Sequence, residues 1–219
     1  MISLRHGRVS LALHPLREAP GRPLLCLHAV GGSARDFRQA AQLWPGPVFA
    51  LDFSGHGDSG PLRGGGYFPE NLAGDADAAL ARIGPALLVG AGIGAYVALL
   101  LAGGRPDAVT GALLLPGAGL EGGGAAPNRA SDTLARWADF GAPLAGCDPA
   151  VRRLERDVRP PEYAEAFARA AGRLLLADGD FPQPPWWQAV RATPTATPVP
   201  GDLAGGLARL ATLSDYLAE

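Results

Sequence analysis

Hydrophobic positions along the chain follow two periods that alternate from one end to the other. Residues 2–6 and 8–15 alternate polar and apolar side chains on either side of Gly7, which predicts an antiparallel hairpin. The apolar runs 23–29 and 47–52 are expected to be strands buried on both faces. Further strands are predicted at 86–90, 110–117, 173–178 and 195–200, which brings the expected number to about eight.

Segments with helical spacing separate these predicted strands. They cover 33–43, 69–83, 93–103, 185–191 and the stretch from about 202 to 217. Ser33 and Asp202 stand where N-caps are expected, because their side-chain oxygens can accept hydrogen bonds from the first turn. Strands that alternate with helices imply right-handed crossovers. The predicted fold class is therefore α/β, with a mostly parallel central sheet and helices on both faces.

A segment between the predicted strands 110–117 and 173–178 has a different character. Residues 119–127 are rich in glycine and read as a linker. Amphipathic helices are expected after it at 128–140, 149–157 and 160–171. We interpret 118–172 as an inserted helical lid within a single domain of residues 1–219.

Composition and charge exclude several classes of protein. Hydrophobic residues make up 47% and charged residues 18% of the chain, which is typical of a globular protein and not of a disordered one. The net charge of −2 gives no basic surface, so no nucleic-acid partner is expected. The N-terminus lacks the apolar core of a signal peptide, and the longest apolar stretch is too short to cross a bilayer. We therefore expect a cytoplasmic protein without a membrane partner.

The stretch LLVGAGIGAYVALLLA, residues 87–102, fits two glycine motifs. It matches the relaxed dinucleotide fingerprint G-x-G-x-x-G/A, and it also matches the strand-turn-helix elbow G-x-S-x-G of serine hydrolases with Gly92 in place of the serine. A dinucleotide site should open the first strand-helix-strand unit and be followed by a strand that ends on an acid. Four predicted strands precede this motif, and the next strand ends in LLLPGAG. Nucleotide binding is thus the weaker interpretation, and no cofactor is expected.

Three segments in order resemble the α/β-hydrolase superfamily. LLCLHAVGGSARDF (24–37) resembles the strand and glycine loop that supply an oxyanion-hole amide, and ALDFSGHGDSG (50–60) resembles the family's D-x-x-G-H-G-x-S segment. VGAGIGAYVALLLA (89–102) follows in the position of the nucleophile elbow. The string GAGIGAY is also similar to the elbow of the N-myc downstream-regulated family, whose members share this fold and are regarded as non-enzymatic.

The resemblance implies a catalytic triad that this chain does not complete. The mechanism needs a hydroxyl at the elbow and an imidazole late in the chain, but the elbow residue is Gly92 and all four histidines precede it. Asp202 stands where the family has its histidine, and Asp178 and Asp180 lie near the position of its acid. Glycine suits the positive φ that such a turn imposes on its central residue.

We therefore expect a catalytically silent homologue that binds a small apolar molecule or a protein partner. His28 is expected to order the glycine loop, and Ala29 replaces a glycine that is usual in the family. Trp186 and Trp187 are adjacent on one short helix, so we expect that only one of them faces the core. The residues predicted to bind ligand are His28, Ala29, Ser33, Gly92, Ile93, Trp137 and Trp187.

The alternative is a hydrolase or lyase with displaced catalytic residues. In that interpretation His28 or His56 acts as a base together with a carboxylate of the cleft, namely Asp52, Asp178 or Asp180. His28, His56 and Asp52 also have the side-chain types that bind metals. Their spacing matches no metal motif, so no metal site is expected.

Overall fold

A single eight-stranded sheet organises the protein. The computed structural model describes residues 1–120, 144–155, 159–181 and 183–215. The strands stand in the order β1-β2-β4-β3-β5-β6-β7-β8; β1, β2 and β4 pair antiparallel and the remaining neighbours pair parallel. The predicted α/β class with a mostly parallel sheet is thus confirmed. The strands are β1 Ile2–His6, β2 Val9–Arg17, β3 Leu24–Leu27, β4 Val48–Asp52, β5 Ala86–Ala91, β6 Val109–Leu115, β7 Leu174–Asp178 and β8 Ala196–Pro200.

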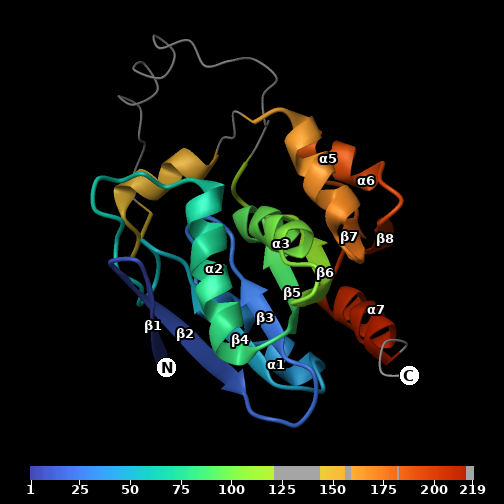
Figure 1. Cartoon of the computed structure of the whole chain (residues 1–219), viewed down its shortest axis with the longest axis horizontal. Coiled ribbons are helices and arrows are strands. Elements are labelled where there is room, and N and C mark those ends of the chain that lie inside the picture. The colour runs from blue at the N-terminus through green and yellow to red at the C-terminus, as the bar shows by residue number, and fades with distance from the viewer. Residues whose placement is uncertain (121–143, 156–158, 182, 216–219) are drawn as a thin grey trace.

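Helices cover both faces of this sheet (Figure 1). One layer consists of α2 (Pro69–Ile83), α3 (Ile93–Gly104), α5 (Pro161–Ala170) and α6 (Pro185–Arg191), which contact one another in sequence. The other layer consists of α1 (Ala40–Leu43) and α7 (Leu203–Asp215). Central strands are buried on both sides: Leu25 and Leu27 of β3 join the core under the first layer, and Leu24 and Cys26 join the core under the second. This explains the continuous apolar runs in the sequence.

Two predicted helices differ from the structure. The single helix expected at 33–43 is a 3₁₀ turn, η1 (Ala34–Phe37), followed by the short α1. Ser33 and Asp36 form a capping box at the start of η1, so the predicted cap is confirmed although the continuous helix is wrong. The segment expected as a helix at 149–157 is the 3₁₀ helix η2 (Pro149–Glu155) over its described part. Asp202 accepts a hydrogen bond from the Gly205 amide at 2.6 Å, which confirms it as a cap of α7.

The described parts of the predicted lid are η2 and α5. Helix α5 packs against α3 and α6, so it lies in the helix layer that covers the sheet. The predicted helix 128–140 and Trp137 lie outside the described residues. The lid therefore stays a prediction.

The parallel strands bring four chain segments to one edge of the sheet. Strands β3, β4, β5 and β6 run in the same direction, so the residues that follow them meet at their carboxyl ends. In open α/β sheets, ligands bind at this edge. The segments that meet there begin at His28, Phe53, Gly92 and Pro116.

Candidate functional site

Gly92 forms the turn between β5 and α3. Its φ of 54° and ψ of −118° confirm the positive φ that the sequence predicts at this position. A Cβ atom built on Gly92 would lie 2.1 Å from the carbonyl oxygen of Ala118. Glycine is therefore required here for two reasons: the backbone conformation is unfavourable for other residues, and the space for a side chain is filled by main chain.

The Ala118 carbonyl oxygen also accepts two backbone hydrogen bonds. The amides of Val30 and Ile93 both donate to it, each with an N···O distance of 3.1 Å. In the α/β-hydrolases that the sequence resembles, the oxyanion hole is made by the amide of the residue after the nucleophile and by an amide from the loop after an earlier strand. Ile93 follows Gly92, and Val30 lies in the loop after β3, so their amides correspond to these two positions.

The segment that carries Ala118 is held firmly at the edge of the sheet. The Gly92 amide donates to the carbonyl of Leu115 at 3.1 Å, and the Leu120 amide donates to the carbonyl of Leu154 at 2.7 Å. Leu120 is fully buried and has a φ of 56°, a conformation that costs a side chain of its type about 1–3 kcal/mol. Burial of the leucine side chain offsets this strain. Sequence reasoning missed Val30 and Ala118 because both act through main-chain atoms.

A cavity of about 100 Å³ lies beside Gly92. It is lined by Gly92, Leu115, Pro116, Gly117, Gly119, Phe181, Pro184, Trp186 and Trp187. Ligand pockets for larger organic molecules usually measure about 300–1,000 Å³, so this cavity is small. Among the residues predicted to bind ligand, Gly92 and Trp187 line it, whereas His28, Ala29, Ser33 and Ile93 do not.

Both tryptophans of α6 are buried, which corrects the expectation that only one of them faces the core. Trp186 is 4% exposed and Trp187 is 2% exposed. The ring of Trp186 meets Tyr96 of α3 at 5.0 Å, while Trp187 meets Phe181 at 5.4 Å. Both are buried because α3, through Tyr96, covers Trp186, and Phe181, in the segment before α6, covers Trp187.

His28 has both ring nitrogens engaged by the main chain. Its Nδ1–H donates to the Ala29 carbonyl at 2.7 Å, and its Nε2 accepts from the Phe53 amide at 3.1 Å. Burial, with a smaller contribution from His56, lowers the pKa of His28 to about 3, so the ring is neutral at pH 7. The imidazole thus ties the loop after β3 to the end of β4. It has no nitrogen left to take a proton from a substrate.

His56 is also buried but has only one hydrogen bond. Its Nδ1 lies 3.2 Å from the Ser54 carbonyl, and among the described residues its Nε2 has no partner. Burial is the main cause that lowers the pKa of His56. The rings of His28 and His56 lie 4.8 Å apart.

The two late carboxylates lie apart from these imidazoles. Asp178 pairs with Arg191 at 2.8 Å on the surface, and the hydrogen bond from this guanidinium lowers the pKa of Asp178. Asp180 is exposed. Within the described part of the chain, neither carboxylate forms a hydrogen bond with His28 or His56.

Asp52 closes the loop that follows β4. Its Oδ1 accepts a hydrogen bond from the Ala34 amide at 2.7 Å, and its Oδ2 accepts one from the Asp58 amide at 2.9 Å. Gly57, with a φ of 51°, packs so closely that a Cβ there would lie 2.3 Å from Oδ2. These contacts explain the D-x-x-G-H-G spacing as that of a tight, carboxylate-centred turn.

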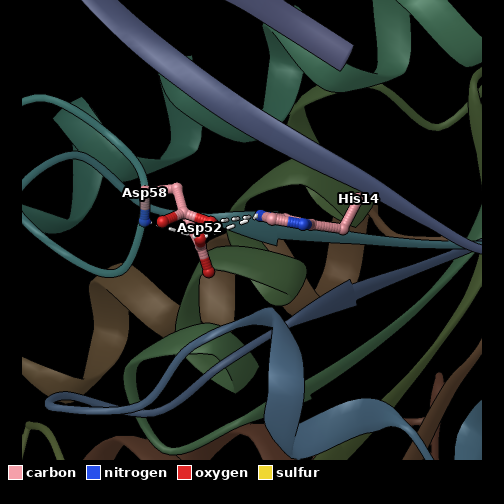
Figure 2. A group of neighbouring side chains, drawn as sticks. All are labelled: His14, Asp52 and Asp58. Atoms are coloured by element: carbon pink, nitrogen blue, oxygen red, sulfur yellow. Dashed lines mark hydrogen bonds and ion pairs between the residues drawn. The ribbon is translucent and has the colours of Figure 1, made fainter. Parts of the chain in front are cut away.

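His14 of β2 reaches the same carboxylate (Figure 2). Its Nε2 lies 3.0 Å from Asp52 Oδ2 and 3.7 Å from Asp58 Oδ2. Sequence reasoning missed His14 and Asp58 as members of this cluster. His14 is 38 positions from Asp52 along the chain, and only the antiparallel pairing of β2 with β4 brings the two together.

No described helix is long and apolar enough to span a membrane. Comparison with solved structures shows the same fold in many proteins that are similar over nearly their whole length, and three of them serve as examples. These are the hypothetical protein PA1622 from Pseudomonas aeruginosa PAO1 (TM-score 0.68, 20% identity, 100% of this chain and 99% of that chain), the enol-lactonase from Burkholderia xenovorans LB400 (0.71, 15%, 97% and 98%) and the Bottromycin epimerase BotH (0.63, 21%, 99% and 97%).

At these identities the likeness concerns the fold alone. The chain matches no curated protein sequence. The model of the Alpha/beta hydrolase family matches residues 24–217, which include the Gly92 turn, the Asp52 loop and all strands from β3 to β8. On this match and on its eight-stranded sheet, the chain belongs to the alpha/beta hydrolase family.

Proposed function

We propose that the protein is a catalytically silent member of its family that binds a small apolar molecule in the cavity beside Gly92. One observation carries the proposal: the Ala118 carbonyl oxygen accepts the amides of Val30 and Ile93 and fills the space of a side chain at position 92. An oxyanion hole stabilises a transition state only when its donors are free to meet the developing charge. Here both donors are already bonded within the protein.

The four histidines support the same conclusion. His6 lies 2.8 Å from Asp75, and His14 pairs with Asp52. His28 and His56 hydrogen-bond to main-chain groups. A serine hydrolase needs an imidazole that hydrogen-bonds to its nucleophile. In the described structure none of these histidine hydrogen bonds reaches the Gly92 turn. The similarity of GAGIGAY to the non-enzymatic N-myc downstream-regulated family agrees with this interpretation.

The walls of the cavity favour an apolar ligand. Leu115, two prolines, Phe181 and the rings of Trp186 and Trp187 supply its side-chain surface. An engineered apolar cavity of about 150 Å³ binds benzene in another protein. A cavity of about 100 Å³ therefore fits a molecule of benzene size or smaller. A protein partner and a cytoplasmic location stay predictions.

Two measurements test this function together. We expect no labelling by a fluorophosphonate probe and no turnover of p-nitrophenyl esters or thioesters. We expect benzene and cyclopentane to raise the melting temperature, and Leu115→Phe, which fills the cavity, to abolish this shift. Leu43→Phe, on the exposed side of α1, is the matched control and should keep it. Covalent labelling or turnover would contradict the silent interpretation, and equal shifts in all three proteins would contradict the ligand site.

His56 supports the alternative function, an enzyme with displaced catalytic residues. Its buried Nε2 is unpaired among the described residues and its neutral ring can accept a proton. BotH, which has the same fold, is named an epimerase, so chemistry other than ester hydrolysis is compatible with this architecture. Turnover of any substrate by the wild type that disappears in His56→Gln would favour this alternative. The silent interpretation predicts no difference between the two proteins.

A further inference from the structure

A cluster of three metal-ligand side chains lies outside the cavity and the Gly92 turn. His14 extends from β2, Asp52 is the last residue of β4, and Asp58 belongs to the loop that follows. Figure 2 shows the imidazole of His14 directed at both carboxylates. One ligand atom from each residue can be chosen so that all three atoms lie within 4.8 Å of one another.

The spacing of these atoms fits a single small cation. Zn²⁺ binds imidazole nitrogen and carboxylate oxygen at about 2.0–2.2 Å, which places neighbouring ligand atoms of a tetrahedral site about 3.3–3.5 Å apart. His14 Nε2 lies 3.0 Å from Asp52 Oδ2 and 3.7 Å from Asp58 Oδ2, values that bracket this spacing. The three ligand atoms lie within 4.8 Å of one another, and the two more exposed side chains, His14 and Asp58, are the ones free to adjust.

The surrounding contacts orient the cluster in advance. The Ala34 and Asp58 amides hold the buried Asp52 carboxylate. Ser59 Oγ donates to the Asp52 carbonyl at 2.5 Å and accepts the Ala12 amide at 2.9 Å, which fixes the loop that carries Asp58. Such outer hydrogen bonds fix the orientation of metal ligands and strengthen binding.

Solvent reaches two of the three side chains of the cluster. The His14 side chain is 23% exposed and the Asp58 side chain is 52% exposed, whereas that of Asp52 is only 3% exposed. An ion can therefore enter without unfolding the loop, and a water molecule can complete a tetrahedral site. Asp52 is the buried member of the cluster. Backbone amides of Ala34 and Asp58 hold its carboxylate in place beneath the two more exposed side chains.

The ligand set decides which cation suits the site. Ca²⁺ and Mg²⁺ prefer oxygen ligands alone, whereas an imidazole suits Zn²⁺ and other transition metals, and Zn²⁺ also binds carboxylate oxygen. We propose that His14, Asp52 and Asp58 form a Zn²⁺-binding site. This site is independent of the function proposed for the Gly92 cavity, and it revises the expectation from the sequence that the protein has no metal site.

The proposal is tested by titrating the EDTA-treated full-length protein with Zn²⁺ in a calorimeter. We expect one site per chain, with affinity reduced about tenfold or more in His14→Gln and in Asp58→Asn. His6→Gln is the matched control, because it removes the other histidine–carboxylate pair of the hairpin, His6 with Asp75, without touching the cluster. Its affinity should equal that of the wild type.

Co²⁺ provides a second readout that does not depend on heat. Binding at three protein ligands and one water should give the intense visible bands of tetrahedral Co²⁺, and these bands should be absent in His14→Gln. Mg²⁺ should not displace the ion. Asp58→Asn keeps the backbone amide that bonds to Asp52, so its circular dichroism should match the wild type and a lost site cannot be attributed to unfolding. Absence of stoichiometric binding by the wild type, or unchanged affinity in His14→Gln, would overturn the proposal.

Discussion

The Gly92 turn and the His14–Asp52–Asp58 cluster use the same edge of the sheet in opposite ways. Gly92 follows β5 and Asp52 ends β4, so both lie at the carboxyl ends of parallel strands. At the Gly92 turn, main-chain donors and acceptors bond to each other. At the cluster, side chains face one another and two of them contact solvent. The carboxyl ends of the strands place several candidate sites at this edge. Whether a site can bind a ligand depends on whether loops and main chain already occupy it, as at Gly92, or leave its side chains exposed, as at His14 and Asp58.

The largest expected effect comes from giving residue 92 a side chain. Gly92→Ala should lower the free energy of unfolding by about 3–5 kcal/mol, because backbone strain adds to the overlap with Ala118. Gly7→Ala is the matched control: Gly7 has a similar φ of 57°, but a Cβ there meets nothing within 4 Å. That variant should lose only about 1 kcal/mol. Urea unfolding of both proteins measures the difference.

Equal losses in the two variants would show that residues 116–118 move aside readily and that the turn can open. In that case Gly92→Ser becomes informative as an activity test. We expect Gly92→Ser to have no esterase activity above background, since no described histidine hydrogen-bonds to the Gly92 turn. A measurable gain in activity would show that a base can reach residue 92, and that the Gly92 turn is open to chemistry in the way the His14–Asp52–Asp58 cluster is.

His28 and His56 should respond unequally to the same substitution. His28→Gln should cost about 2–3 kcal/mol, since it leaves the buried Phe53 amide and the Ala29 carbonyl without their partner. His56→Gln should cost about 1 kcal/mol, because one hydrogen bond is lost. Similar losses in thermal or urea unfolding would mean that the two main-chain contacts of His28 do not distinguish it from His56.

The pH dependence of stability sharpens this assignment. The pKa of His28 is lowered to about 3 in the folded protein, against about 6.5 in an unfolded chain. Between these values the unfolded state binds the extra proton, so acid favours unfolding and the contribution of His28 to stability is lost as the pH falls from about 6.5 to about 3. His28→Gln should reduce the slope of unfolding free energy against pH in this window by up to about 1.4 kcal/mol per pH unit. An unchanged slope would contradict a buried neutral His28.

The smallest effect is expected at the cluster without metal. His14→Gln in the presence of EDTA should change the free energy of unfolding by less than about 1 kcal/mol, because a partly exposed histidine–carboxylate pair contributes little. Added Zn²⁺ should stabilise the wild type and not this variant, since an ion that binds only the folded state raises its stability. A loss of several kcal/mol in EDTA would instead assign His14 a structural role like that of His28.

The fold was predictable from the sequence because it depends on periodicity. Apolar strands such as β3 and helix α2 repeat at the spacing that buries them, and the observed bounds of α2 equal the predicted 69–83. The positive φ of Gly92 followed from the strand-turn-helix pattern in the same way. The break in the helix after Ser33 could not be predicted in this way, because its first turn is held by the carboxylate of Asp52 at the end of β4.

Most of the site could not be predicted. Ala118 and Val30 act through main-chain atoms that every residue possesses, so no residue type marks them. His14 meets Asp58 only because β2 pairs with β4. The burial of both Trp186 and Trp187 depends on α3 and on the segment before α6, which the sequence of α6 does not show. Long-range pairing and backbone contacts limit such reasoning more than motifs do.

The carbonyl of Ala118 has a consequence for how this protein could change over evolutionary time. This blocking group is a main-chain carbonyl oxygen, so a substitution of Ala118 would not remove it, because every amino acid carries one. The Val30 and Ile93 amides would therefore stay bonded to this carbonyl in variants of residue 118. At Gly117 and Gly119 a Cβ would lie 2.8 Å from the Gly92 amide nitrogen and from the Ile93 Cβ, respectively, so a side chain at either position would shift the backbone that carries this carbonyl.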